Sequence, residues 1–245
     1  MTVRFVGSGD AFGSGGRFQT CLYLEAGEAR LLLDCGASSL VAMKRQGVDP
    51  GGIDTILISH LHGDHFGGVP FFILDAQFSR RIRPLTVAGP PGLAARLPQA
   101  MEALFPGSSQ TQQKFDLRLV ELPEREATRL GPVAVTPFQV VHASGAPPYA
   151  LRVEAADRTV VYSGDTEWTD ALIDAARGAD LFICECYYFD KQVKFHLNYR
   201  TLMDQRNRLD CRRLVLTHLS NDMLARLADV QAEVEVAEDG HVVSL

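Results

Sequence analysis

Short apolar runs of strand length recur along the whole chain. They are rich in Val, Ile, Leu and Thr, and Gly, Pro, Asp or Ser bounds them, as is usual for strands buried in a layered protein. We therefore predict strands over Val3–Val6, Cys21–Leu24, Arg30–Leu33, Thr55–Ser59, Leu85–Val87, Val133–Val135, Leu151–Glu154, Thr159–Tyr162, Leu181–Cys184 and Leu214–Thr217.

Helical patterns lie between some of these strands, at Ser38–Arg45, Gly68–Gln77, Leu93–Leu104, Asp170–Ala176 and Tyr199–Arg208. Both halves of the chain are expected to consist mostly of hairpin-connected strands with occasional helices. No repeat, low-complexity tract or linker separates the halves, and 245 residues fit one large domain better than two. The pattern predicts an α/β layered protein with mixed sheets, in a single domain over residues 1–245.

Acidic and imidazole side chains stand where several predicted strands end. Each of these residues comes after an apolar run: Asp34, His60, His142, Asp165 and His218. In layered α/β proteins, ligand sites form outside the carboxyl ends of strands, where rigid elements aim side chains from loops. We therefore expect these residues to converge on one site.

The segment from His60 to His65 is the densest group of such side chains. It holds three imidazoles and the Asp64 carboxylate, a combination that suits zinc and other first-row divalent ions. A lone histidine is usually a core or surface residue. Here, however, five of the chain's seven histidines belong to the segment or follow a predicted strand, which favours metal binding.

We expect two metal ions. The motif supplies at most four ligands, and the other strand ends supply the remainder that a second ion needs. Asp165 is the expected bridge, since its two oxygens can each face one cation while its charge offsets their repulsion. The ligand sets are His60, His62 and His142 for the first ion, and Asp64, His65 and His218 for the second.

Composition narrows the class of substrate. Hydrophobic residues make up 46% of the chain and charged residues 22%, with a net charge of −6 and a pI of about 5.6. Such a chain has no general basic surface for nucleic acid, so an RNA substrate would need a local patch. Arg80-Arg81-Ile82-Arg83 is the sole basic cluster, and it is more typical of a solvated helix end than of a phosphate groove.

Cysteine usage and hydropathy predict the compartment. The five cysteines are odd in number and lack C-x-x-C spacing, which argues against a disulfide framework or a cysteine zinc site. There is no leader-like N-terminus and no apolar run of about 18 residues. We predict a cytoplasmic protein without membrane association.

The motif His60-Leu-His-Gly-Asp-His65 resembles the H-x-H-x-D-H mark of the metallo-β-lactamase superfamily. Its ribonuclease Z-like branch is similar in Ser59–His65 with the following Gly68-Val-Pro, and in Ser163-Gly-Asp-Thr. The resemblance implies a four-layer αββα sandwich with two divalent ions at one edge. Zinc is the expected metal, with manganese and iron as alternatives.

The same resemblance implies an acid–base pair outside the metal shell, formed by Glu185 and His196. His196 would stabilise the phosphoryl oxygens or protonate the leaving group, and Glu185 would hold its ring. The alternative for His196 is a solvated loop histidine. Asp34 is expected either to accept a hydrogen bond from a ligand imidazole or to cap the helix at Ser38–Arg45.

The predicted mechanism is hydrolysis by a hydroxide shared between the two ions, which lower the pKa of water from about 15.7 toward neutrality. Asp64 would hold or accept the proton of this nucleophile. A phosphodiesterase acting on a small-molecule or nucleotide diester, or on RNA ends, is the first hypothesis. A hydrolase of carboxyl esters, lactones or thioesters is the second, and an inert metal-binding module is the third.

Two features bear on partners. Ribonuclease Z proper carries a long arm that clamps tRNA, but only 22 residues separate His142 from Asp165, which leaves no room for it at that point. The resemblance therefore supports the chemistry more firmly than a tRNA substrate. Dimers are common in this branch, so a homodimer is also open; the apolar Phe71–Leu74 would serve either an interface or the core.

Overall fold

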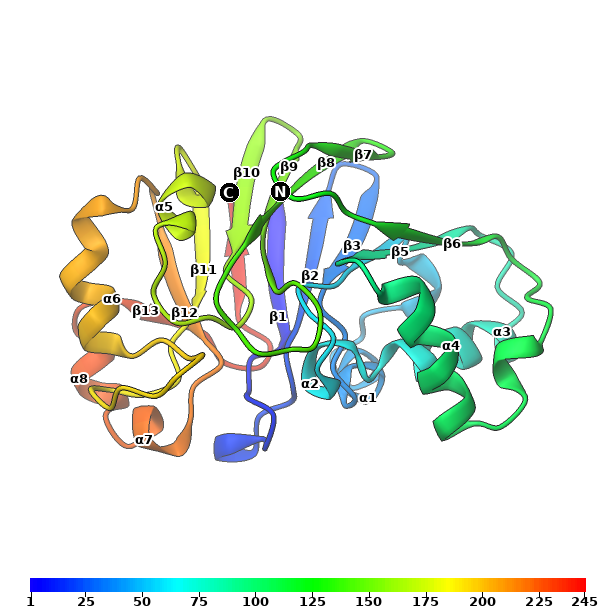
Figure 1. Ribbon diagram of the computed structural model, residues 1–245, viewed down its shortest axis with the longest axis horizontal. Coiled ribbons are helices and arrows are strands. Elements are labelled where there is room, and N and C mark those ends of the chain that lie inside the picture. The colour runs from blue at the N-terminus through cyan, green and yellow to red at the C-terminus, as the bar shows by residue number, and fades with distance from the viewer.

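Two seven-stranded mixed sheets form the centre of the computed structural model, which describes all 245 residues (Figure 1). The first sheet runs in the order β14 (Val242–Ser244), β1 (Thr2–Gly7), β2 (Cys21–Ala26), β3 (Ala29–Leu33), β4 (Thr55–Leu57), β5 (Leu85–Gly89) and β6 (Leu117–Glu121). The second runs in the order β13 (Glu235–Val236), β12 (Leu214–Thr217), β11 (Leu181–Glu185), β10 (Arg158–Tyr162), β9 (Tyr149–Ala155), β8 (Val133–Gln139) and β7 (Thr128–Leu130).

Helices cover the outer face of each sheet (Figure 1). The first sheet is covered by α1 (Ser39–Arg45), α2 (Gly63–Phe66), α3 (Val69–Phe78) and α4 (Leu93–Leu104). The second is covered by α5 (Ala171–Ala176), α6 (Tyr199–Gln205), α7 (Asn221–Leu224) and α8 (Leu227–Gln231). None of these helices has the length and apolar character needed to cross a membrane.

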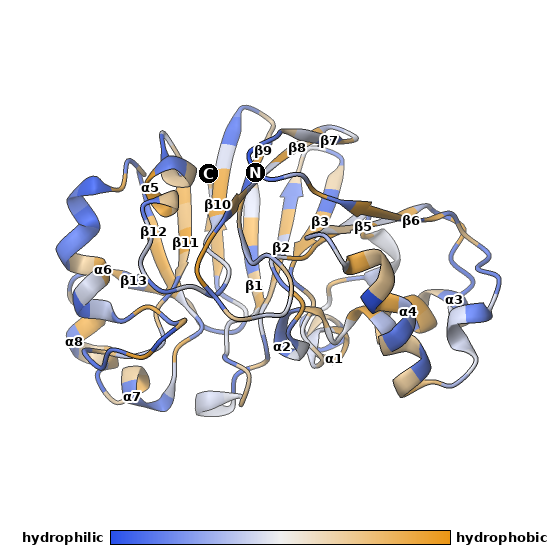
Figure 2. Cartoon of the chain, in the orientation of Figure 1, coloured by the Kyte–Doolittle hydropathy of each residue, from blue (hydrophilic) through white to orange (hydrophobic).

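Three apolar cores separate the four layers. Strand residues alternate between them, because successive side chains point to opposite faces of a sheet. Phe5 packs in the core between the sheets, whereas its neighbour Val6 packs against the helices of the first sheet. Val160 and Val161 divide in the same way on the second sheet. The expected αββα sandwich is thus confirmed, and Figure 2 shows its hydrophobic residues concentrated in the central strands.

All the predicted strands and helices are present, with small differences at their ends. The sequence pattern missed the short elements β6, β7, β13, β14, α2, α7 and α8. Several of these are too brief or too exposed to show a period; β13, for example, has two residues. Within α3, Phe72 and Ile73 are core residues, whereas Phe71 is 37% exposed.

The expectation of mostly hairpin-connected strands is wrong for half of each sheet. Strands β3 to β6 pair in parallel, and so do β10 to β13. Parallel neighbours need a crossover, and the helices on the outer faces supply it. The carboxyl ends of these strands therefore lie at the same edge of the sandwich, where the residues that follow them can meet.

The basic cluster at residues 80–83 follows the end of α3, and Arg80 and Arg83 are exposed as expected for a solvated helix end, whereas Arg81 is not. Arg81 is 5% exposed, and its guanidinium donates to five backbone carbonyls, those of Pro50, Gly51, Ile53, Arg83 and Pro84. Arg83 forms an ion pair with Asp54. Both arginines lie where β4 and β5 begin, and they join the end of α3 to these strands.

We predict that Arg81→Met lowers the free energy of unfolding by about 2–4 kcal/mol, because five carbonyls, including that of the buried Ile53, lose a charged donor. Urea unfolding followed by circular dichroism would measure the change. Arg96→Met on the exposed face of α4 is the matched control, with an expected loss below about 0.5 kcal/mol. Equal losses in the two variants would contradict a structural role for Arg81.

Candidate metal centre

The candidate site lies at the edge where strands β3, β4, β8, β10 and β12 end. His60 follows β4, Asp165 follows β10 and His218 follows β12. His142 follows β8, which runs in the same direction as β10 because both are antiparallel to β9. The topology therefore delivers these side chains to a common point, as expected for the carboxyl ends of strands.

The first cluster consists of His60, His62 and His142, whose ligand nitrogens lie within 4.8 Å of one another. Their ring centroids form a nearly equilateral triangle, with sides of 4.8–4.9 Å. The Nε2 atom of His142 lies 3.1 Å from Nδ1 of His62. This is the group that the sequence assigned to the first ion.

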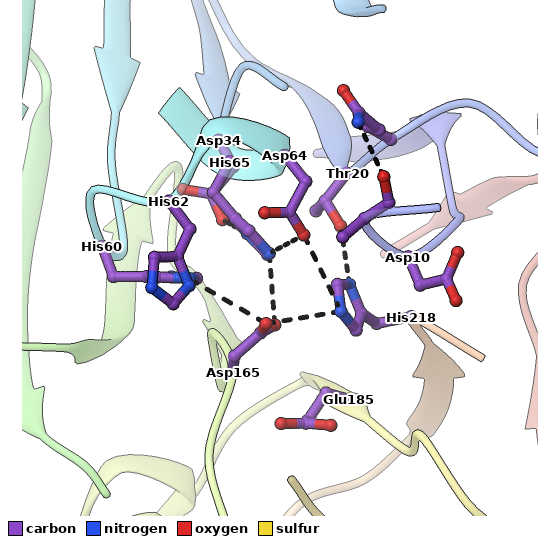
Figure 3. A network of polar contacts seen from close by, with 12 residues as sticks. Asp10, Thr20, Asp34, His60, His62, Asp64, His65, Asp165, Glu185 and His218 are labelled. Carbon is purple, nitrogen blue, oxygen red and sulfur yellow. Dashed lines mark hydrogen bonds and ion pairs between the residues drawn. The ribbon is translucent and has the colours of Figure 1, made fainter. Parts of the chain in front are cut away.

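The second cluster consists of Asp64, His65, Asp165 and His218, all buried. The Nε2 atom of His65 lies 3.1 Å from Asp64 Oδ2 and 3.3 Å from Asp165 Oδ1. The Nε2 atom of His218 lies 3.3 Å from Asp165 Oδ2. Figure 3 shows Asp165 between the rings of His60 and His218.

Asp165 touches both clusters. Its Oδ2 atom lies 3.9 Å from His60 Nε2 and 4.0 Å from His142 Nε2, in addition to its contact with His218. One carboxylate thus faces imidazoles of both groups. Its position between the two clusters is where the predicted bridge would lie.

The residues present fit a pair of divalent cations. Three buried atoms at the centre lack a hydrogen-bonding partner, namely His60 Nε2, His65 Nε2 and Asp165 Oδ1. A buried polar atom without a partner costs about 1–3 kcal/mol, so each needs a compensating ligand. Imidazole nitrogens and carboxylate oxygens that face a common centre are the donor set of zinc and related ions.

Partners behind the ligands orient the rings. The fully buried Asp34 lies 2.7 Å from Nδ1 of His65 and accepts hydrogen bonds from the backbone and hydroxyl of Ser59. A proton on Nδ1 of His65 leaves its Nε2 lone pair free for a cation. Asp34 is therefore an orienting acceptor; the cap position of α1 is occupied by Ser38.

Two further orienting contacts were not predicted. Thr20 Oγ1 lies 3.2 Å from Nδ1 of His218, and the carbonyl oxygen of Phe195 lies 2.8 Å from Nδ1 of His142. Neither has a sequence signal, because a hydroxyl at a strand start and a loop carbonyl resemble many others. Both hold a ligand ring so that its other nitrogen faces the cluster.

The backbone is strained at the site. Asp34, Phe195 and His218 have φ values of 60°, 73° and 60°, although none is glycine. Residues in this left-handed region cost on the order of 1–3 kcal/mol each and tend to cluster where function requires a fixed geometry. Gly164, with φ 60°, precedes Asp165, and a Cβ atom there would meet the Tyr149 carbonyl oxygen at 2.6 Å.

The charges of the cluster shift one another's pKa values. Burial lowers the pKa of His60 well below its usual value, and the neighbouring His65 lowers it further. Burial would also lower the pKa of His65, but Asp165, Asp34 and Asp64 raise it well above its usual value. A cation at Nε2 of His65 would face two of these carboxylates, Asp64 and Asp165, while Asp34 remains at Nδ1.

Glu185 and His196 form the predicted pair beside the clusters. Both carboxylate oxygens of Glu185 lie 3.3 Å from Nδ1 of His196. The His196 ring stacks on Tyr187 and lies 5.1 Å from the ring of His142. Its ligand nitrogen also lies within 4.8 Å of the ligand atoms of His142 and Asp165, so this histidine directly borders the clusters.

Burial raises the pKa of Glu185 to about 7. Burial would lower the pKa of His196, but its hydrogen bond to Glu185 and the charges of Glu185 and Asp165 raise it to about 9. Cations bound at the neighbouring ligands would lower the pKa of His196 again. The pair can thus hold a proton at the edge of the site.

The loop after β1 has a structural role. Asp10 is fully buried, and its carboxylate accepts hydrogen bonds from Phe12 and Ser14. Arg17, which could have reached a substrate anion, instead donates to the carbonyl oxygen of Ala237 at 2.7 Å. Asp10 comes shortly after the apolar run Val3–Val6, as the candidate ligands come after theirs. This position could have indicated that Asp10 is buried.

Known proteins resemble this chain over nearly its whole length. The family model described as anti-Pycsar protein Apyc1 matches residues 1–243. Ribonuclease Z of Agathobacter rectalis is 26% identical, with 94% of this chain and 93% of that protein covered.

Two solved structures share the fold. Human tRNase Z, short form, superposes with a TM-score of 0.80 at 26% identity, covering 100% of this chain and 99% of that one. The metallo-β-lactamase fold protein YhfI from Bacillus subtilis superposes with a TM-score of 0.76 at 22% identity, covering 99% and 98%. The chain therefore has the metallo-β-lactamase fold.

We predict that the purified protein binds two divalent ions per chain after metal loading. Asp165→Ala should lower the occupancy of both positions because Asp165 faces both clusters, whereas His142→Ala should mainly empty one. Elemental analysis would measure the ions. His241→Ala is the control, since His241 pairs with Glu235 away from the clusters and its loss should leave both ions bound. One ion or fewer in the unmodified protein, or two in Asp165→Ala, would contradict the dinuclear arrangement.

Proposed function

Because the chain belongs to the family of the anti-Pycsar protein Apyc1, we propose that it is a metal-dependent phosphodiesterase that hydrolyses a small nucleotide. One observation carries the proposal. A buried carboxylate, Asp165, faces two clusters of metal-binding side chains, and the Glu185–His196 pair borders both. A proton donor at this point suits the departing oxygen of a phosphodiester, whereas a thiolate leaves a thioester without protonation.

The proposed ligands are the residues assigned from the sequence. His60, His62 and His142 would hold one ion, Asp64, His65 and His218 the other, and Asp165 both. Two divalent cations, when bound, activate water and offset the charge of phosphoryl oxygens. Zinc suits this imidazole and carboxylate set, and manganese or iron would also be accepted by it.

The chain's own residues would position and move protons. Asp64 Oδ2 lies beside the second cluster, 3.1 Å from His65 Nε2. From this position it would accept a proton from the attacking water. His196 would donate a proton from Nε2 to the departing oxygen, because Nδ1 faces Glu185. Glu185 would keep the ring charged and oriented, and stacking on Tyr187 would fix its plane. General acid catalysis of this kind contributes about 10²–10⁴ in rate.

A cyclic nucleotide monophosphate is the substrate class that we propose. Membership of the Apyc1 family supports this substrate class. Two features also favour a small substrate over a long RNA. Only 22 residues separate His142 from Asp165, and the net charge of −6 repels a long polyanion. The cavity beside Arg81 is a poor site for RNA, because Asp49 and Asp75 also line it and its cations Lys44 and Arg83 pair with Asp75 and Asp54.

We predict that the metal-loaded protein hydrolyses a 3′,5′-cyclic nucleotide monophosphate and bis-(p-nitrophenyl) phosphate, and that precursor tRNA is cleaved slowly or not at all. Affinity for tRNA should be weak and fall steeply with salt, because the net charge is −6 and the cavity beside the clusters holds a single lysine, Lys194. The measurement is kcat/KM for each substrate at physiological salt, with a lactone and a thioester alongside. More efficient cleavage of precursor tRNA, or cleavage of the lactone or thioester but no diester, would overturn the proposal.

His196→Ala should retain both ions and a near-normal KM, while kcat falls by about 10²–10⁴, because its role lies in the transition state. Elemental analysis and steady-state kinetics on the small diester separate the alternatives. Loss of an ion would make His196 a ligand, and an unchanged kcat would make it a solvated loop residue. His241→Ala is again the matched control.

A further inference from the structure

A cavity of about 390 Å³ opens beside the candidate metal centre, between the segment after Asp165 and the loop that precedes α6. Its wall includes His196, the residue that borders both clusters. A phosphodiester held at the clusters would therefore extend one substituent past the His196 ring and into this cavity. The other residues of the wall decide which substituent fits.

The aromatic part of the wall is Trp168, three residues after Asp165. Its backbone is held close to the centre, because the neighbouring Glu167 donates its N–H to the carbonyl oxygen of Val141 at 3.1 Å. The indole is half-buried, packs against the core of the second sheet, and has the Arg208 guanidinium 5.9 Å from its ring centroid. A large aromatic side chain thus forms part of a cavity that solvent can enter.

A fixed hydrogen-bond donor lies in the same wall. Asn198 is 5% exposed, and its Oδ1 accepts from the backbone N–H of Thr201 at 2.9 Å, which caps α6. Its side-chain amide nitrogen donates to no other protein group and is not one of the fully buried atoms without a partner, so it is open to the cavity. Capping holds the amide plane in place, so this NH₂ group is a preorganised donor for a ligand acceptor.

Apart from His196, which Glu185 keeps charged, the wall carries no net charge. Glu167 and Lys194 contribute one charge of each sign, and Gln192 adds an uncharged amide. A second phosphate would meet a carboxylate here, and a purely aliphatic group would leave the Asn198 donor unpaired at a cost. A flat heterocycle with ring nitrogens or carbonyl oxygens satisfies both the indole and the amides.

We propose that this cavity binds the nucleobase of the substrate, with Trp168 in contact with the base and the Asn198 amide donating to its edge. The inference rests on the proposed function, since it assumes that the diester is a nucleotide. Contact between a base and an aromatic side chain is sequence-tolerant, whereas amide donors select bases with a matching acceptor. Trp168 and Asn198 are then specificity-determining residues of the site.

The test uses the full-length, metal-loaded protein and the fluorescence of Trp168, which is the only tryptophan of the chain. Titration with a nucleoside 5′-monophosphate should change the fluorescence saturably, whereas ribose 5-phosphate, which lacks the base, should not. Trp168→Ala should raise KM for the cyclic nucleotide about 5- to 100-fold, as expected for the loss of an aromatic contact with the base, and Trp168→Phe should restore most of the affinity.

Asn198→Asp is the second variant, because aspartate preserves the cap of α6 but removes the NH₂ donor. It should keep the unfolding midpoint near that of the unmodified protein while raising KM for the cyclic nucleotide. Phe78→Ala is the control for removing an aromatic ring, since Phe78 is 85% exposed at the end of α3 and should leave KM unchanged.

The outcomes separate this inference from the proposed function. Hydrolysis of cyclic nucleotides with no fluorescence change and an unaltered KM in Trp168→Ala and Asn198→Asp would overturn the base-binding cavity and leave the phosphodiesterase standing. A base-dependent fluorescence change without hydrolysis of any diester would support the base-binding cavity and overturn the phosphodiesterase. An effect of Trp168→Ala on thioester or lactone hydrolysis alone would assign the cavity to an acyl group and overturn the inference.

Discussion

A buried carboxylate surrounded by imidazoles is the constraint on which the rest of this structure depends. Asp165 lies within 4.0 Å of His60, His65, His142 and His218, and several facing atoms have no partner in the protein. Such an arrangement is unfavourable in a core unless cations complete it. The candidate ligand side chains therefore form a binding site. The rest of the fold must hold them there, although removing these polar groups from water costs free energy.

The sandwich meets this requirement by placing strand ends at one edge. Inter-sheet packing of residues such as Phe5 and Tyr162 makes the strands rigid, and loops of a few residues then carry the ligands. The orienting contacts of Asp34, Thr20 and the Phe195 carbonyl set the ring directions. The positive φ values of Asp34, Phe195 and His218 show that this geometry requires strained backbone conformations.

One loop joins the chemistry to the choice of substrate. The segment between β11 and α6 carries His196, orients His142 through the Phe195 carbonyl, and ends at Asn198, the cap of α6. Together with Trp168, which follows the bridging Asp165, it forms the wall of the neighbouring cavity. Ligand orientation, proton donation and the proposed recognition of the base thus depend on the same few residues.

The sequence alone determined the layered class, the central strands and the candidate ligand residues, because alternating apolar runs and a dense His/Asp motif are local signals. It could not show that half of each sheet is parallel, since strand direction depends on how distant segments pair. Nor could it distinguish Arg81 from a surface arginine, or find the roles of Thr20, Phe195, Trp168 and Asn198. Those roles arise from contacts between residues far apart in the chain, which only the tertiary structure brings within hydrogen-bonding distance.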